Sequence, residues 1–163
     1  MKGVRPNSET SRRSGVKGGR RRARELALRG LYQWLVARTP PETIRLDLVE
    51  SANFAKCDVA FFDKLWRGVT DEFETLIAAL VPFVDRAPAQ LSPIEKGILV
   101  IGAWELLRAP ETPYRVAINE AVELAKAYGG TDGHKYVNGV LNGLAPKLRS
   151  VEVEADRATG KAR

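Results

Sequence analysis

The sequence predicts an all-α protein in which about six to seven helices form two small helical bundles. Apolar residues recur at three- and four-residue spacing along most of the chain, which is the period of an amphipathic helix. No stretch shows the alternation of apolar and polar residues, bounded by turn residues, that indicates a strand. With 163 residues, 44% of them hydrophobic and 28% charged, the chain is long enough to enclose a core.

Three helices are predicted in the N-terminal half of the chain. The first spans about residues 20–37 and stops before the Thr-Pro-Pro of residues 39–41, because proline disfavours helical torsions in the residue before it. A short helix follows at about 42–50. The third begins near Asp58, whose carboxylate can cap the first turn, and Pro82 marks its end or a kink.

Three more helices are predicted in the C-terminal half. The fourth has the clearest start, because Ser92-Pro93-Ile94-Glu95 has the spacing of a capping box with proline at the first helical position. Its GILVIGAWELL run is apolar on nearly every side, which predicts a central helix. The fifth opens at the Thr-Pro of residues 112–113 and ends at Gly129-Gly130, and the last spans about 132–148.

The flanking segments lack this periodicity. Residues 1–18 mix glycine, serine, asparagine and arginine, and we expect a disordered basic tail. Residues 150–163 are expected to form a second disordered tail. Between them, residues 19–149 form the helical domain, with an N-terminal bundle at about 19–82 and a C-terminal bundle at about 91–149.

Positive charge is concentrated at the N-terminus. The net charge is +6, and residues 1–24 hold nine Lys or Arg against Glu9 alone, so the rest of the chain is slightly acidic. Such a block typically meets nucleic acid, an anionic membrane or an acidic protein surface, and the alternative is a solubilising tail. Arg20, Arg21, Arg22 and Arg24 fall in the first turn of the predicted helix, where the backbone dipole repels cations. An anionic partner would relieve that repulsion.

Several classes of protein are excluded by composition. The single cysteine, Cys57, rules out an internal disulfide and a cysteine-rich zinc site. No apolar run reaches the roughly 18–20 residues that span a bilayer, and the N-terminus has no apolar signal-peptide segment. We therefore expect a cytoplasmic protein without a membrane span.

Signatures of catalysis are also weak. The only histidine, His134, lies beside an apolar stripe at a helix start, which favours packing or capping over acid–base chemistry. Glu120 and Glu123 share one helix and are more typical of a solvated face. The glycines of residues 129–133 follow a helix rather than a strand, which indicates a turn and not a phosphate loop. We expect no enzyme activity, no cofactor and no metal.

One aromatic residue supports nucleic-acid binding. On a helical wheel Arg21, Glu25, Leu28 and Tyr32 run down one side of the first helix. Tyr32 lies at the edge of the core stripe on the side of the arginines, where it could stack on an unpaired base. The alternative, a half-buried core tyrosine, fits the spacing equally well.

Two stretches carry a family resemblance. Residues 113–145, PYRVAINEAVELAKAYGGTDGHKYVNGVLNGLA, closely resemble the signature of the NusB family of bacterial transcription antitermination factors. The Arg-Arg-x-Ala-Arg-Glu-x-Ala-x-x-x-Leu-Tyr-x-Trp pattern that ends at Trp34 matches as well, as does Leu91-Ser92-x-x-Glu95. The resemblance covers about residues 20–149.

This resemblance implies a fold of two helical bundles and no catalysis. Family members bind boxA, a short single-stranded RNA element in the leaders of ribosomal RNA operons, together with NusE, the tenth protein of the small ribosomal subunit. They help RNA polymerase in the antitermination complex to resist termination. The partner NusE is expected to dock away from the loop after the fifth helix, on helices of both bundles. By motif position, the implied RNA-binding residues are Arg20, Arg21, Arg22, Arg24, Tyr32, Tyr128, Asp132, Lys135 and Tyr136.

Some alternatives stay open. Asp132 repels phosphate, so it would accept from a base edge, cap the last helix or restrain affinity. Val100, Trp104 and Asn142-Gly143 depart from residues common in the family. A protein-docking module with little dependence on RNA is a second interpretation. A ribosomal RNA methyltransferase is a third, although no cofactor-binding glycine motif supports it. The oligomeric state is open, including a homodimer that buries the arginine surface.

Overall fold

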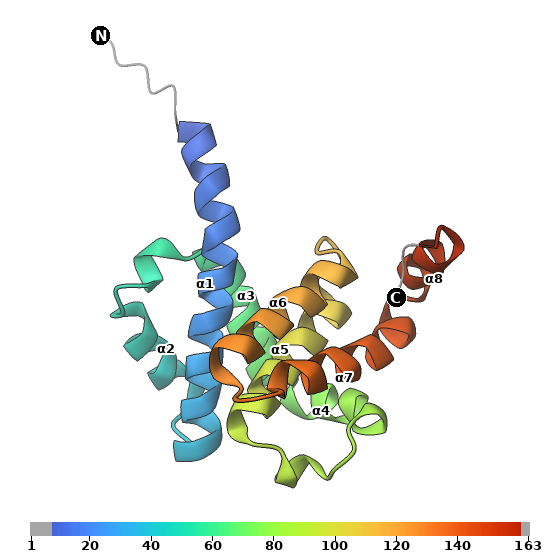
Figure 1. The fold of residues 1–163 in the computed structure, drawn as a ribbon. Coiled ribbons are helices and arrows are strands. Elements are labelled where there is room, and N and C mark those ends of the chain that lie inside the picture. The colour runs from blue at the N-terminus through green and yellow to red at the C-terminus, as the bar shows by residue number, and fades with distance from the viewer. Residues whose placement is uncertain (1–7, 161–163) are drawn as a thin grey trace. The chain divides into compact units, whose positions relative to one another are not determined.

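The computed structural model describes the backbone of residues 8–160 and the side chains of residues 18–160. The prediction of an all-α fold is confirmed: the described residues form eight α-helices and three short 3₁₀ turns (Figure 1). The α-helices are α1 (Ser8–Ala37), α2 (Pro41–Val49), α3 (Val59–Asp71), α4 (Phe73–Leu80), α5 (Pro93–Arg108), α6 (Tyr114–Tyr128), α7 (Gly133–Leu148) and α8 (Ser150–Ala158). The 3₁₀ turns are η1 (Phe54–Lys56), η2 (Val81–Phe83) and η3 (Pro88–Gln90).

The chain divides into two compact units, but not where the sequence suggested. Unit 1 is Met1–Trp66 and unit 2 is Arg67–Arg163, so the division falls inside α3 and not at residues 82–91. The reason is that α4 packs on α5 and η2 packs on α7. Both elements therefore belong with the C-terminal helices.

Unit 1 is built around α1. Its core joins Leu31 of α1 with Ile44 of α2 and Phe62 of α3, all fully buried. The helices approach closely at Gly30, where an added Cβ would lie 2.7 Å from the Trp66 ring. Trp66 donates from Nε1 to the carbonyl of Pro41 at 3.3 Å, which satisfies the one polar atom of its ring.

The start of α1 differs from the prediction. The helix begins at Ser8 and not near residue 20, so residues 8–18, expected to be disordered, are helical, whereas residues 1–7 of that tail lie outside the described residues. Extending a packed helix fixes only one residue for each hydrogen bond, and arginine is a good helix former. The four arginines therefore lie in the interior of α1, away from the N-terminal dipole that was expected to repel them.

Asp58 caps α3, as the sequence indicates. Its Oδ1 accepts from the backbone N–H of Phe61 at 3.0 Å. The backbone N–H of Asp58 donates to the carbonyl of Gly19 at 3.0 Å, and a Cβ on Gly19 would lie 2.7 Å from that nitrogen. Glycine is therefore needed at residue 19 for α1 and α3 to meet.

Unit 2 surrounds α5, which packs against α4, α6 and α7 (Figure 1). The capping box is present: Ser92 Oγ accepts from Glu95 N at 3.1 Å and Glu95 Oε1 accepts from Ser92 N at 3.3 Å. Every residue from Gly97 to Leu106 is buried, so the prediction of a central helix is confirmed.

The helix predicted from Asp58 to Pro82 is two helices, α3 and α4. They meet at Glu72, whose backbone φ of −107° and ψ of 20° are not helical. Glu72 pairs with Arg108 of α5 at 2.9 Å. Gly68 lies against Trp104 so closely that an added Cβ would be 1.9 Å from its Nε1, which fixes the path of the chain before the break.

The prediction of a disordered C-terminal tail is wrong for residues 150–158, which form α8. The carboxylate of Glu152 accepts from the first backbone N–H of α6, that of Tyr114, at 2.9 Å. Asp156 accepts from the Tyr114 hydroxyl at 2.9 Å and from Arg115 Nε at 2.7 Å. These contacts join segments about forty residues apart, so local periodicity did not predict them.

Candidate nucleic-acid interface

The arginine cluster of α1 is divided between the interior and the surface of unit 1. Arg21 and Arg22 are exposed, Arg20 is half-buried and Arg24 is 4% exposed. The reason is the helical period of 3.6 residues, which turns positions 20 and 24 to one side and 21 and 22 to others. Of the four arginines, Arg21 and Arg22 are the more available to a ligand.

Arg20 and Arg24 both contact the ring of Phe61. Their guanidinium carbons lie 4.8 Å and 5.1 Å from the ring centroid, within the range of cation–π contact. Arg20 Nε also lies 3.6 Å from the Asp58 carboxylate that caps α3. These two arginines fasten α1 to the start of α3, a structural role that the sequence did not indicate.

One exposed face of α1 runs from Arg22 towards the end of the helix. Arg29 is exposed seven residues later, and Tyr32 follows three residues after it with 46% of its surface exposed. Residues at these spacings share one face of a helix. Tyr32 is therefore a surface side chain and not a core tyrosine. Arg29 was missed by sequence reasoning, although its spacing from Arg22 and Tyr32 was a usable signal.

The residues of unit 2 that are expected to bind RNA lie around the loop between α6 and α7. Tyr128 ends α6 with 50% of its surface exposed. The chain then reverses through two residues with positive φ, Gly130 at 75° and Asp132 at 62°. Glycine adopts this conformation without strain, and aspartate tolerates it better than most residues.

Asp132 stands at the N-cap position of α7 but makes no side-chain capping hydrogen bond. Its Oδ1 lies instead 3.4 Å from Nζ of Lys135, and both side chains are exposed. Helix capping, one of the three roles considered for this carboxylate, is therefore not observed. The pair leaves the lysine partly neutralised at the surface.

Tyr136 is half-buried and covered by an arginine that the sequence did not single out. The guanidinium carbon of Arg86 lies 4.5 Å from the centroid of the Tyr136 ring. Arg86 Nε donates to Asp85 Oδ1 at 2.9 Å, and this hydrogen bond holds the pKa of Asp85 below its usual range. Burial raises the pKa of the Tyr136 hydroxyl.

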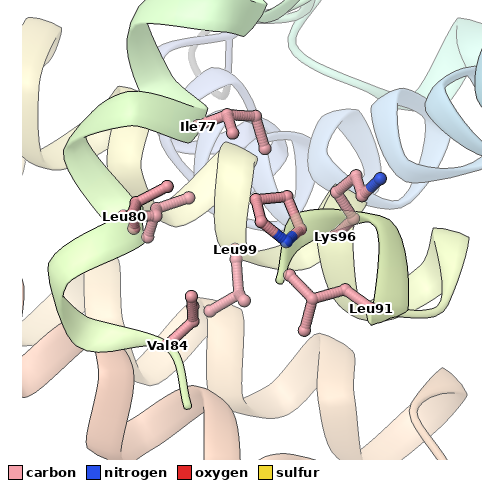
Figure 2. Close-up of a pocket in the computed structure, with 8 residues that line it drawn as sticks. Ile77, Leu80, Val84, Leu91, Lys96 and Leu99 are labelled. Carbon is pink, nitrogen blue, oxygen red and sulfur yellow. The ribbon is translucent and has the colours of Figure 1, made fainter. Parts of the chain in front are cut away.

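An apolar pocket lies elsewhere on unit 2, with an empty volume of about 220 Å³ that includes its open mouth (Figure 2). Its lining consists of Ile77, Leu80, Val81, Val84, Pro88, Leu91, Lys96 and Leu99. Lys96 supplies the one charged group of that lining. The pocket thus offers contacts to an apolar group rather than an arrangement for acid–base chemistry.

Other chemistry in the described part of the chain is limited. Cys57 is a half-buried free thiol, and burial raises its pKa. Among residues 18–160, no three His, Cys, Asp or Glu side chains are grouped so that they could hold a metal ion. None of the helices described combines the length and apolar character that a membrane crossing requires.

The nine residues expected at an RNA surface therefore fall into two groups. Unit 1 holds the arginines and Tyr32, and unit 2 holds the four residues around the loop after α6. Fold and surface together define an all-helical protein that exposes arginine, lysine and tyrosine side chains, which suit phosphates and unstacked bases.

Comparison with known proteins gives the family. The NusB family model matches residues 21–146. The "Transcription antitermination protein NusB" of Ralstonia pickettii (strain 12J) is 50% identical over 93% of this chain and 97% of its own length. The protein of the same description from Azoarcus sp. (strain BH72) is 55% identical over 85% of this chain and 90% of its own length.

A solved structure agrees with the sequence comparisons. The structure described as "T. maritima NusB" has a TM-score of 0.72 and 25% identity, and the match covers 82% of this chain and 96% of that one. The chain belongs to the NusB family.

Proposed function

We propose that this protein is a transcription antitermination factor of the bacterial cytoplasm that binds boxA-type single-stranded RNA in ribosomal RNA leaders. It does so together with the ribosomal protein NusE, and the complex helps RNA polymerase to resist termination. The observation that carries the proposal is the face of α1 on which Arg22, Arg29 and Tyr32 are exposed together. The relatives are described as transcription antitermination proteins, which supports this role for the chain.

The positive charge exposed on α1 supports this proposal. In the complex, the exposed guanidinium groups of Arg21 and Arg22 contact RNA phosphates and release counterions. The affinity for RNA therefore falls as the salt concentration rises. An exposed tyrosine on the same helix supplies a flat surface for an unstacked base, worth about 1–3 kcal/mol in single-strand binders. Tyr128 offers a second such surface at the end of α6.

The test is a titration of labelled boxA RNA against a scrambled RNA of the same composition. Fluorescence anisotropy would be measured with and without NusE at two salt concentrations. We expect boxA to bind more tightly than the scrambled RNA, and we expect NusE to increase this preference.

Two outcomes would contradict the proposal in different ways. Equal, salt-sensitive binding to both RNAs would mean that the basic surface is a generic anchor. Binding of NusE without any effect of boxA would favour the second candidate, a protein-docking module.

A further inference from the structure

We propose that an RNA base stacks beside the loop between α6 and α7 on the guanidinium of Arg86, and not on the ring of Tyr136. The inference rests on the proposed RNA-binding function and adds a residue that the family motif did not indicate. It also reassigns Tyr136 from a direct contact to a support for Arg86.

Arg86 covers one face of the Tyr136 ring. The Arg86 guanidinium carbon lies 4.5 Å from the centroid of the Tyr136 ring, so the cation covers the near face of that ring. A base that stacked on this face would first have to displace Arg86. The Arg86 side chain is 37% exposed, so it is accessible from solvent while it covers the ring.

The neighbouring carboxylate, that of Asp85, holds Arg86 in place. Asp85 accepts from Arg86 Nε at 2.9 Å, and this bond and the tyrosine ring together restrain the guanidinium. A planar guanidinium can stack on bases as well as pair with phosphates. Stacking keeps the Asp85 ion pair intact, whereas a phosphate on Arg86 would compete with Asp85 and be repelled by it. Stacking is therefore the favoured mode.

The two modes predict different salt dependence. A phosphate contact adds about 0.7 to the log–log salt slope for a single strand, while a stacked base adds little. Lysine keeps the charge but lacks the planar group, so Arg86→Lys separates charge from stacking. The pair Asp85→Asn with Arg86→Gln preserves the net charge and removes the cation.

The experiment is a boxA titration of the full-length protein and these variants over a range of salt concentrations. Arg86→Ala is expected to weaken binding about tenfold with an unchanged slope. Arg86→Lys and the charge-neutral pair are expected to be weakened to a similar extent. Melting curves by circular dichroism would show that the exposed substitution leaves the fold intact.

Arg115 supplies a matched control. It contacts the ring of Tyr114 at 5.9 Å and pairs with Asp156 at 2.7 Å, but at the opposite end of α6 from Tyr128. Arg115→Ala thus removes the same kind of contact away from the loop, and its boxA affinity should equal that of the unmodified protein.

Two results would overturn the inference, and a third would overturn the proposed function on which it rests. Unchanged or tighter binding by Arg86→Ala would mean that the uncovered Tyr136 ring stacks directly. A slope reduced by about 0.7, with recovery in Arg86→Lys, would identify a phosphate contact. Absence of boxA binding by the unmodified protein would instead contradict the proposed function, which distinguishes the two failures.

Discussion

At the scale of single residues, neighbouring arginines in α1 have different roles. Arg24 is buried against Phe61, whereas Arg22, two positions earlier, is exposed. The sequence groups these residues as one basic cluster because all four carry the same charge. Their environments differ because successive helical positions are rotated by about 100°. Stability and RNA affinity should therefore depend on different members of the cluster.

Arg24→Ala is expected to lower the free energy of unfolding by about 1–3 kcal/mol, because it removes a buried side chain and its cation–π contact. Arg22→Ala should change it by less than about 0.5 kcal/mol. Urea titrations followed by circular dichroism would measure both values.

For boxA affinity, Arg22→Ala should have a larger effect than Arg24→Ala. Arg22→Ala is expected to weaken binding and to reduce the salt slope by about 0.7, the loss of one phosphate contact. Equal stability losses in the two variants would contradict this division of roles.

A second residue-scale feature is Arg149, which is buried at the end of α7. It donates from Nε to the carbonyl of Leu106 at 2.7 Å and from Nη2 to those of Ala109 and Thr112 at 2.8 and 3.0 Å. These carbonyls belong to the end of α5 and the segment after it, where backbone acceptors lack helical partners.

Arg149→Ala should therefore cost about 3 kcal/mol or more, because buried carbonyls lose charged donors. Arg149→Lys should recover only part of this lost stability, since an ammonium group cannot donate to the same widely spaced carbonyls as a guanidinium. Thermal unfolding would measure both variants, and a loss below about 1 kcal/mol for the alanine variant would contradict the assignment.

At the scale of elements, α8 shows how a polar segment can be structural. Val153 is buried, and the carboxylates of Glu152 and Asp156 contact Tyr114 and Arg115 at the start of α6. A carboxylate on the first amides of a helix satisfies an orphan donor and complements the helix dipole. The segment α8 thus caps α6, although the two helices are separated in the sequence by α7.

A chain that ends at Arg149 should unfold more easily, by about 1–3 kcal/mol, because α6 loses its cap and Tyr114 loses its hydroxyl partner. A chain that ends at Gly160 is the control and should match the full-length protein. Differential scanning calorimetry would compare them. Equal midpoints for the two truncations would show that α8 contributes nothing to unit 2.

At the scale of the whole molecule, charge is distributed unevenly. The net charge is +6, yet the residues after position 24 are slightly acidic in sum. Residues 1–17 alone carry five Lys or Arg against Glu9. Such a segment attracts any polyanion, whereas discrimination between RNA sequences requires contacts to bases.

Deleting residues 1–17 is therefore expected to weaken boxA and scrambled RNA by similar factors and to reduce the salt slope for both. The preference for boxA should remain, because Arg22, Tyr32 and the loop after α6 are retained. Parallel anisotropy titrations would measure the ratio of the two affinities. Loss of that ratio would mean that the N-terminal segment itself reads the RNA sequence.

Local periodicity and side chains three residues apart were enough to predict the helical class, the central position of α5 and the caps at Asp58 and Ser92. The sequence also indicated Tyr32 and the residues around the loop after α6 as candidate contacts. The folded chain was needed to show which arginines are buried, that α8 caps α6, and that Arg86 covers Tyr136. Each of these depends on contacts between residues distant in the chain, which a local pattern does not encode.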